Sequence, residues 1–111
     1  KALPHPRSYG AATRALGFIG REKHDLPLEE IIYKMSGKVA AHMGIHDRGV
    51  IQVGKAADLV AFDPATVKDQ ATFTEPGQAP VGIDYVIVNG QIAVAGGVQS
   101  EVRAGKVLSA L

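Results

Sequence analysis

Cysteine and tryptophan are missing from this sequence, and each absence narrows what the chain can do. Without cysteine there is no disulfide and no thiolate ligand for a metal. This absence agrees with a reducing compartment, so we expect a cytoplasmic protein. Aromatic residues make up only 5% of the chain, which leaves little surface for ring stacking.

An excess of charge is missing as well. The 12 basic and 11 acidic residues give a net charge of +1, and no basic block stands out. We therefore expect no binding to nucleic acid or to a membrane surface. No apolar run approaches the roughly 18 residues that crossing a bilayer requires, so a membrane is not an expected partner either.

What the sequence does contain is material for a modest globular core. The chain has 111 residues, of which 46% are apolar, as is usual for one domain. Residues 8–44 have a helical pattern. One apolar stripe precedes a break at residues 24–27, and Pro27 then suits the first turn of a second helix. We expect Ser36 to cap a short final helix that ends at Gly44 in a left-handed conformation.

From residue 45 onward the pattern is typical of β-structure. We expect strands at residues 49–55 and 57–63, the second buried on both faces because its apolar run is nearly continuous. Residues 66–82 lack periodicity and form a loop long enough to lie across a neighbouring surface. Asn89 and Gly90 stand between two β-branched runs, 84–88 and 91–95, which predicts a hairpin. The tail after Val98 is weakly patterned.

The four histidines do not predict a metal site. They stand at His5, His24, His42 and His46, without the spacings that bring two imidazoles to one metal. His42 and His46 are one helical turn apart, but Gly44 lies between them and no carboxylate is suitably spaced. We interpret the histidines as surface or packing residues and expect no metal bound by this chain.

A proline-rich segment near the start is the first candidate site. Pro4 and Pro6 keep the chain extended and limit where His5 and Arg7 can point. A fixed arginine ahead of a helix is a good carboxylate binder, because its planar guanidinium pairs with both oxygens. The alternative is a stiff connector whose arginine makes a surface ion pair.

Asp58 is the second candidate, because it follows a glycine turn and could act as a general base. An aspartate in this position more often binds backbone N–H groups in a turn. No partner acid, base or nucleophile lies near it in sequence, which favours the structural role.

Taken together, these segments resemble the N-acyl-D-amino-acid deacylases (D-aminoacylases) of the amidohydrolase superfamily. The segment 5–17 resembles the stretch after the last barrel strand of these enzymes, and residues 28–35 followed by Gly44 resemble the last barrel helix. Residues 48–64 and 83–90 are similar to the small β-domain that many amidohydrolases share. The block from His5 to Arg7 is the part that indicates the deacylases.

The resemblance implies an α+β chain taken from a larger enzyme. Residues 1–44 would be the terminal loop and helices of a (β/α)₈ catalytic barrel, and residues 45–111 the C-terminal part of a small β-sandwich. The parent would use zinc to hydrolyse N-acyl-D-amino acids to a D-amino acid and a carboxylate. Its metal ligands and catalytic Asp would lie upstream of Lys1, so this chain alone would be inactive. Arg7 would bind the substrate α-carboxylate, and His5 would help to position it.

Two alternatives remain at this point. Another amidohydrolase, of the dihydroorotase or hydantoinase type, would fit the β-half equally well but would not be expected to have the block from His5 to Arg7. A stand-alone binding or assembly domain would have no enzymatic parent. If the chain is part of a barrel enzyme, its helix stripe and strand edges lack their partners, and we expect it to self-associate when isolated.

Overall fold

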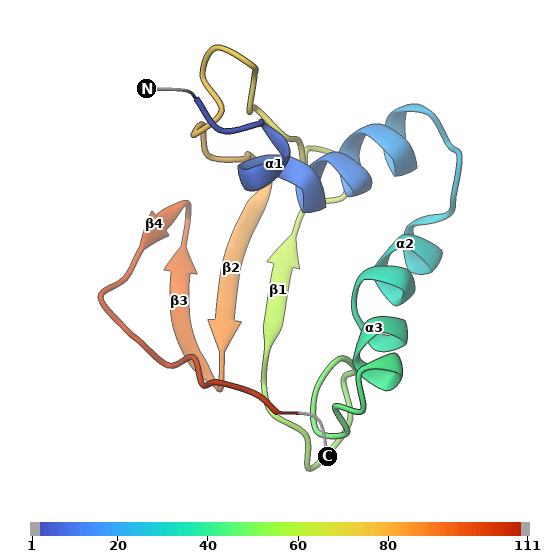
Figure 1. Ribbon diagram of the computed structural model, residues 1–111, viewed down its shortest axis with the longest axis vertical. Helices are drawn as coiled ribbons and strands as arrows, with labels where there is room; N and C mark the ends of the chain where they lie inside the picture. The colour runs from blue at the N-terminus through green and yellow to red at the C-terminus, as the bar shows by residue number, and fades with distance from the viewer. Residues whose placement is uncertain (1–2, 110–111) are drawn as a thin grey trace. The chain divides into compact units, whose positions relative to one another are not determined.

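The computed structural model describes residues 3–109 (Figure 1). These residues form two compact units. The first unit combines residues 3–31 with 62–83, and the second combines residues 32–61 with 84–109. Each unit therefore joins a helical segment to a segment from the β-half of the chain. Within residues 3–109, no helix has the length and apolar character needed to cross a membrane.

The first unit opens with a continuous helical segment, as its apolar stripe predicts. Helix α1 (Arg7–Arg14) follows Pro6, whose φ of −52° already suits a helix start. It runs directly into η1 (Ala15–Glu22), where the helix widens to the π form. The segment ends at Glu22, and His24 just beyond it has a φ of +54°, so the predicted break before Pro27 is confirmed.

The core of this unit lies between the helical segment and the loop at residues 66–82. Leu16, Ile31 and Val67 form it, and Val67 is completely buried. Arg21 on η1 donates hydrogen bonds to the carbonyl oxygens of Val67, at 2.6 Å, and Pro64, at 3.2 Å. The prediction that the long loop lies across a neighbouring surface is therefore confirmed.

Helices α2 (Leu28–Met35) and α3 (Gly37–His42) follow, with Ser36 between them. The predicted side-chain cap at Ser36 is wrong: its hydroxyl instead donates to the carbonyl oxygen of Gly49, at 2.9 Å. The nearby loop carbonyl takes the place of the helix N–H groups as its partner. Gly44 has a φ of +73°, which confirms the predicted left-handed end.

Four strands form one sheet in the order β1-β2-β3-β4 (Figure 1). They are β1 (Leu59–Phe62), β2 (Ile83–Val88), β3 (Gln91–Ala95) and β4 (Val98–Gln99). Strands β2 and β3 pair antiparallel around Asn89 and Gly90, whose φ values of +47° and +79° confirm the predicted hairpin. A register shift between Val86 and Ile87 interrupts the pairing.

The structure also corrects two expectations. Residues 49–55 form turns rather than a strand, and Val53 is fully exposed there. β-Branched residues cannot make a strand without a partner, and glycines with positive φ bound this segment on both sides. Strand β1 is not buried on both faces in this chain, because Val60 is 54% exposed. The short strand β4 was not predicted.

Candidate functional site

His5 and Arg7 lie together at the start of α1. The backbone N–H of Arg7 donates to Nδ1 of His5 at 3.1 Å, and the N–H of Ser8 donates to the carbonyl oxygen of His5 at 3.0 Å. The imidazole, one residue before the N-cap Pro6, thus accepts one of the backbone N–H groups that the first turn of a helix leaves without a partner. Its ring also meets Phe73 edge-on, with centroids 5.1 Å apart.

This arrangement fixes the backbone of Arg7 and leaves its side chain exposed. The ion pairs among residues 3–109 join Lys23 to Asp25 and Arg48 to Asp58, so Arg7 has no carboxylate partner in this part of the chain. The first turn of α1 contains no acidic residue. The Arg7 side chain is therefore exposed and makes no ion pair with the residues that the structure describes.

No metal centre is found among the histidines that the structure describes. Within residues 3–109, no three His, Asp or Glu side chains are grouped so that they could hold a metal ion. The residues that the structure describes therefore do not fit a zinc centre of their own.

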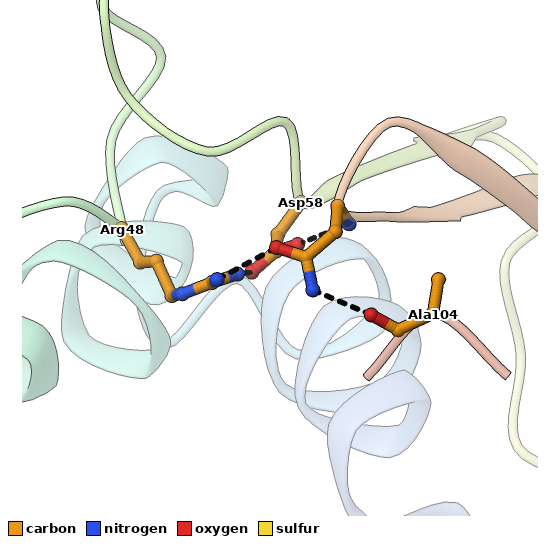
Figure 2. Close-up of polar contacts among 4 residues, drawn as sticks. Arg48, Asp58 and Ala104 are labelled. Carbon is orange, nitrogen blue, oxygen red and sulfur yellow. Dashed lines mark hydrogen bonds and ion pairs between the residues drawn. The ribbon is translucent and has the colours of Figure 1, made fainter. Parts of the chain in front are cut away.

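A second polar cluster lies in the second unit, and Figure 2 shows its members converging. Arg48 donates to a carboxylate oxygen of Asp58 and, at 2.6 Å, to Oδ1 of Asn89. The backbone N–H of Asn89 donates to the other oxygen of Asp58 at 2.7 Å. The Asn89 side-chain amide donates to the carbonyl oxygen of Ala104 at 2.6 Å. We call these four residues the Arg48 network.

The Arg48 network assigns Asp58 a structural role. The hydrogen bond from the Asn89 backbone, together with the bond and charge of Arg48, lowers the pKa of Asp58 below its usual value. A carboxylate with a depressed pKa is a weak base and already has its partners, so the general-base alternative loses its support. Arg48 and Asn89 were not predicted as partners of Asp58, because they lie 10 and 31 residues from it in the sequence.

Comparison with known proteins identifies the family of this chain. Residues 2–94 match the amidohydrolase family. The chain belongs to that family. The amidohydrolase chain is 49% identical over 87 residues to a D-aminoacylase of Alcaligenes xylosoxydans xylosoxydans, covering 78% of this chain and 18% of the relative. It is 45% identical over 106 residues to an N-acyl-D-aspartate deacylase of the same organism, covering 96% of this chain and 21% of the relative.

Solved structures agree with the sequence relatives. The crystal structure of a D-aminoacylase superposes with a TM-score of 0.93 at 44% identity, over 96% of this chain and 22% of that one. An N-acyl-D-glutamate deacylase from Bordetella bronchiseptica, complexed with zinc and a phosphonate inhibitor, superposes with a TM-score of 0.80 at 42% identity, over 92% of this chain and 22% of that one. The family expectation is confirmed, and the amidohydrolase chain spans about a fifth of the length of these relatives.

Proposed function

We propose that this chain is part of an enzyme that hydrolyses N-acyl-D-amino acids to a D-amino acid and a carboxylate. The observation that carries the proposal is the superposition on a D-aminoacylase with a TM-score of 0.93 at 44% identity over 96% of the chain. The curated relatives support it, since each is named for removing an acyl group from a D-amino acid or is called a D-aminoacylase.

Within this proposal, Arg7 binds the α-carboxylate of the substrate. Such a substrate always carries that carboxylate, whichever side chain or acyl group it has. Arg7 is exposed, has no carboxylate partner within residues 3–109 and starts a helix whose first turn holds no acidic residue. A guanidinium in this state can pair with both carboxylate oxygens of an incoming ligand.

His5 positions Arg7 rather than reacting itself. Its Nδ1 accepts the Arg7 backbone N–H, and Phe73 restrains the ring from the side. An acceptor at Nδ1 places the proton of the neutral imidazole on Nε2. Because two prolines flank His5, the segment has few other conformations. The backbone from which the Arg7 side chain extends is therefore held in place before a ligand binds.

The remaining parts of the site belong to the rest of the enzyme. Residues 1–44 are assigned to the end of the catalytic barrel and residues 45–111 to the small β-sandwich, although the two compact units follow a different division. Zinc is present in the complex of the N-acyl-D-glutamate deacylase, and a binuclear metal centre is described for D-aminoacylase. We propose that the zinc ligands of the parent enzyme lie outside residues 3–109, within which no three His, Asp or Glu side chains are grouped so as to hold a metal ion. A cytoplasmic location stays a prediction.

The test is an assay of the full-length protein with matched enantiomers. The proposal predicts release of a free D-amino acid from an N-acetyl-D-amino acid, with little release from its L enantiomer. Cyclic amides of the dihydroorotate and hydantoin types serve as the third and fourth substrates. Turnover confined to the cyclic amides would favour the other amidohydrolase class, and the absence of any turnover by metal-loaded protein would favour a binding or assembly role.

A further inference from the structure

The turn between β2 and β3 contains a chemically reactive pair. When asparagine precedes glycine, the glycine backbone nitrogen can attack the asparagine side-chain amide carbon, because glycine has no Cβ to hinder the approach. In this chain a bond would form between the Gly90 nitrogen and Cγ of Asn89, and the bond from Cγ to Nδ2 would break. The Gly90 nitrogen gives up its proton, and Nδ2 leaves as ammonia. Water then opens the ring to aspartate or isoaspartate.

Every group that takes part in this reaction is already engaged in the structure. The attacking nitrogen of Gly90 donates its proton to the carbonyl oxygen of Ala57, at 2.9 Å. The leaving nitrogen, Nδ2 of Asn89, donates to the carbonyl oxygen of Ala104, at 2.6 Å. Oδ1 of Asn89 accepts from Arg48 at 2.6 Å (Figure 2).

We propose that Asn89–Gly90 is a latent deamidation site, which the Arg48 network and the Ala57 carbonyl keep closed in the folded protein. Ring closure needs a Gly90 nitrogen that is free to lose its proton, and Ala57 holds that proton in a hydrogen bond. It also needs the Asn89 amide to swing toward Gly90, whereas Arg48 and Ala104 fix both ends of that amide. The hydrogen bond from Arg48 also polarises the side-chain amide carbon of Asn89. This polarisation does not promote attack while the Gly90 nitrogen stays bonded to Ala57.

Deamidation at this site would be irreversible because ammonia is lost, and the product could not rebuild the Arg48 network. The side chain of an aspartate at position 89 has no N–H to donate to Ala104, and it adds a second carboxylate beside Asp58. An isoaspartate also lengthens the backbone by one carbon at a turn where the N–H groups of residues 89 and 90 bind Asp58 and Ala57. The segment around Ala104 would then lose a side-chain anchor, which is a consequence of chemical ageing for this end of the chain.

The experiment measures the deamidation rate at residue 89 by peptide mapping of the full-length protein at mildly alkaline pH. Native protein is compared with the same protein in urea, and we expect the native rate to be many-fold lower. Equal rates in the two states would overturn the proposal. This comparison needs no variant, so a variant that fails to fold cannot leave the proposal untested.

Two variants then separate the Arg48 network from folding in general. Arg48→Met should raise the native rate several-fold, and Asp58→Asn, which loosens Arg48 while keeping the side-chain shape, should raise it less. Arg103→Met, at an exposed arginine, is the matched control and should leave the rate unchanged. A folded Arg48→Met protein that deamidates at the wild-type rate or more slowly would overturn the proposal, because Arg48 would then be neutral or would promote the reaction.

Discussion

Gly17→Ala should destabilise the protein even though alanine is the better helix former. Gly17 lies in η1, where a Cβ added to it would come within 2.5 Å of the backbone carbonyl oxygen of Val67. A backbone atom of a completely buried residue cannot easily move away, and Arg21 holds the same oxygen with a hydrogen bond. The close approach of helix and loop therefore depends on the missing side chain.

The expected magnitude follows from two opposing effects. Exchange of glycine for alanine inside a helix stabilises by about 1 kcal/mol when the site has room. Overpacking of a well-packed core costs about 1–3 kcal/mol. The contact is well below any normal Cβ distance, so the upper part of that range applies, and the net loss in the free energy of unfolding should be about 1–2 kcal/mol.

Gly20→Ala is the matched control in the same helix. Its added Cβ would meet Cδ1 of Ile31 at 2.8 Å, which is the far end of a flexible side chain. We expect a change within about 1 kcal/mol for this variant. Both variants of the full-length protein are compared by urea unfolding followed by circular dichroism. A Gly17→Ala protein as stable as the Gly20→Ala protein would refute the close approach of η1 to Val67.

Three further predictions concern the acid stability of the protein and the behaviour of the isolated chain. Because the folded-state pKa of Asp58 is lowered, its contribution to stability is present above its unfolded pKa and is lost as the pH falls through the folded value. The stability gap between wild type and Asp58→Asn should therefore be largest near neutral pH and narrow below about pH 4; a gap that widens in acid would contradict this. The isolated chain should self-associate, since Ile32, Met35 and Val39 are at least 39% exposed; a concentration-independent monomer in light scattering would count against it. The isolated chain should also retain no stoichiometric zinc after dialysis and show no deacylase turnover. Retained zinc or measurable turnover would place the metal site within this chain.

Local sequence signals predicted much of the fold. The helical stripe, the break before Pro27, the left-handed Gly44 and the hairpin at Asn89 all depend on residues close together in the chain, and the structure confirms them. The strand expected at residues 49–55 fails because a strand depends on a partner that periodicity does not reveal. Strand β4 has only two residues, too few for a pattern.

The polar sites, like the strands, were predicted only where the residues involved lie close together in the sequence. The Arg48 network joins residues that stand 10 to 41 positions apart, and it was missed because no spacing motif links them. The charge of Arg48 beside the glycine turn was the available signal, but the sequence did not indicate which carboxylate it binds. His5 and Arg7 came from two prolines and a family resemblance, and their role in binding substrate stays a prediction.

The most direct test of the account pairs a variant with a substrate change in the full-length enzyme. Wild type, Arg7→Ala and Arg7→Lys are assayed with an N-acetyl-D-amino acid and with the corresponding carboxamide, which lacks the α-carboxylate charge; Arg14→Ala, at an exposed arginine of the same helix, is the control. The account predicts that Arg7→Ala lowers kcat/KM for the carboxylate substrate by the equivalent of about 2–5 kcal/mol, that Arg7→Lys recovers part of this loss, and that the carboxamide is barely affected. Equal losses for both substrates, or an unchanged kcat/KM in Arg7→Ala, would contradict the assignment of Arg7 to the substrate carboxylate.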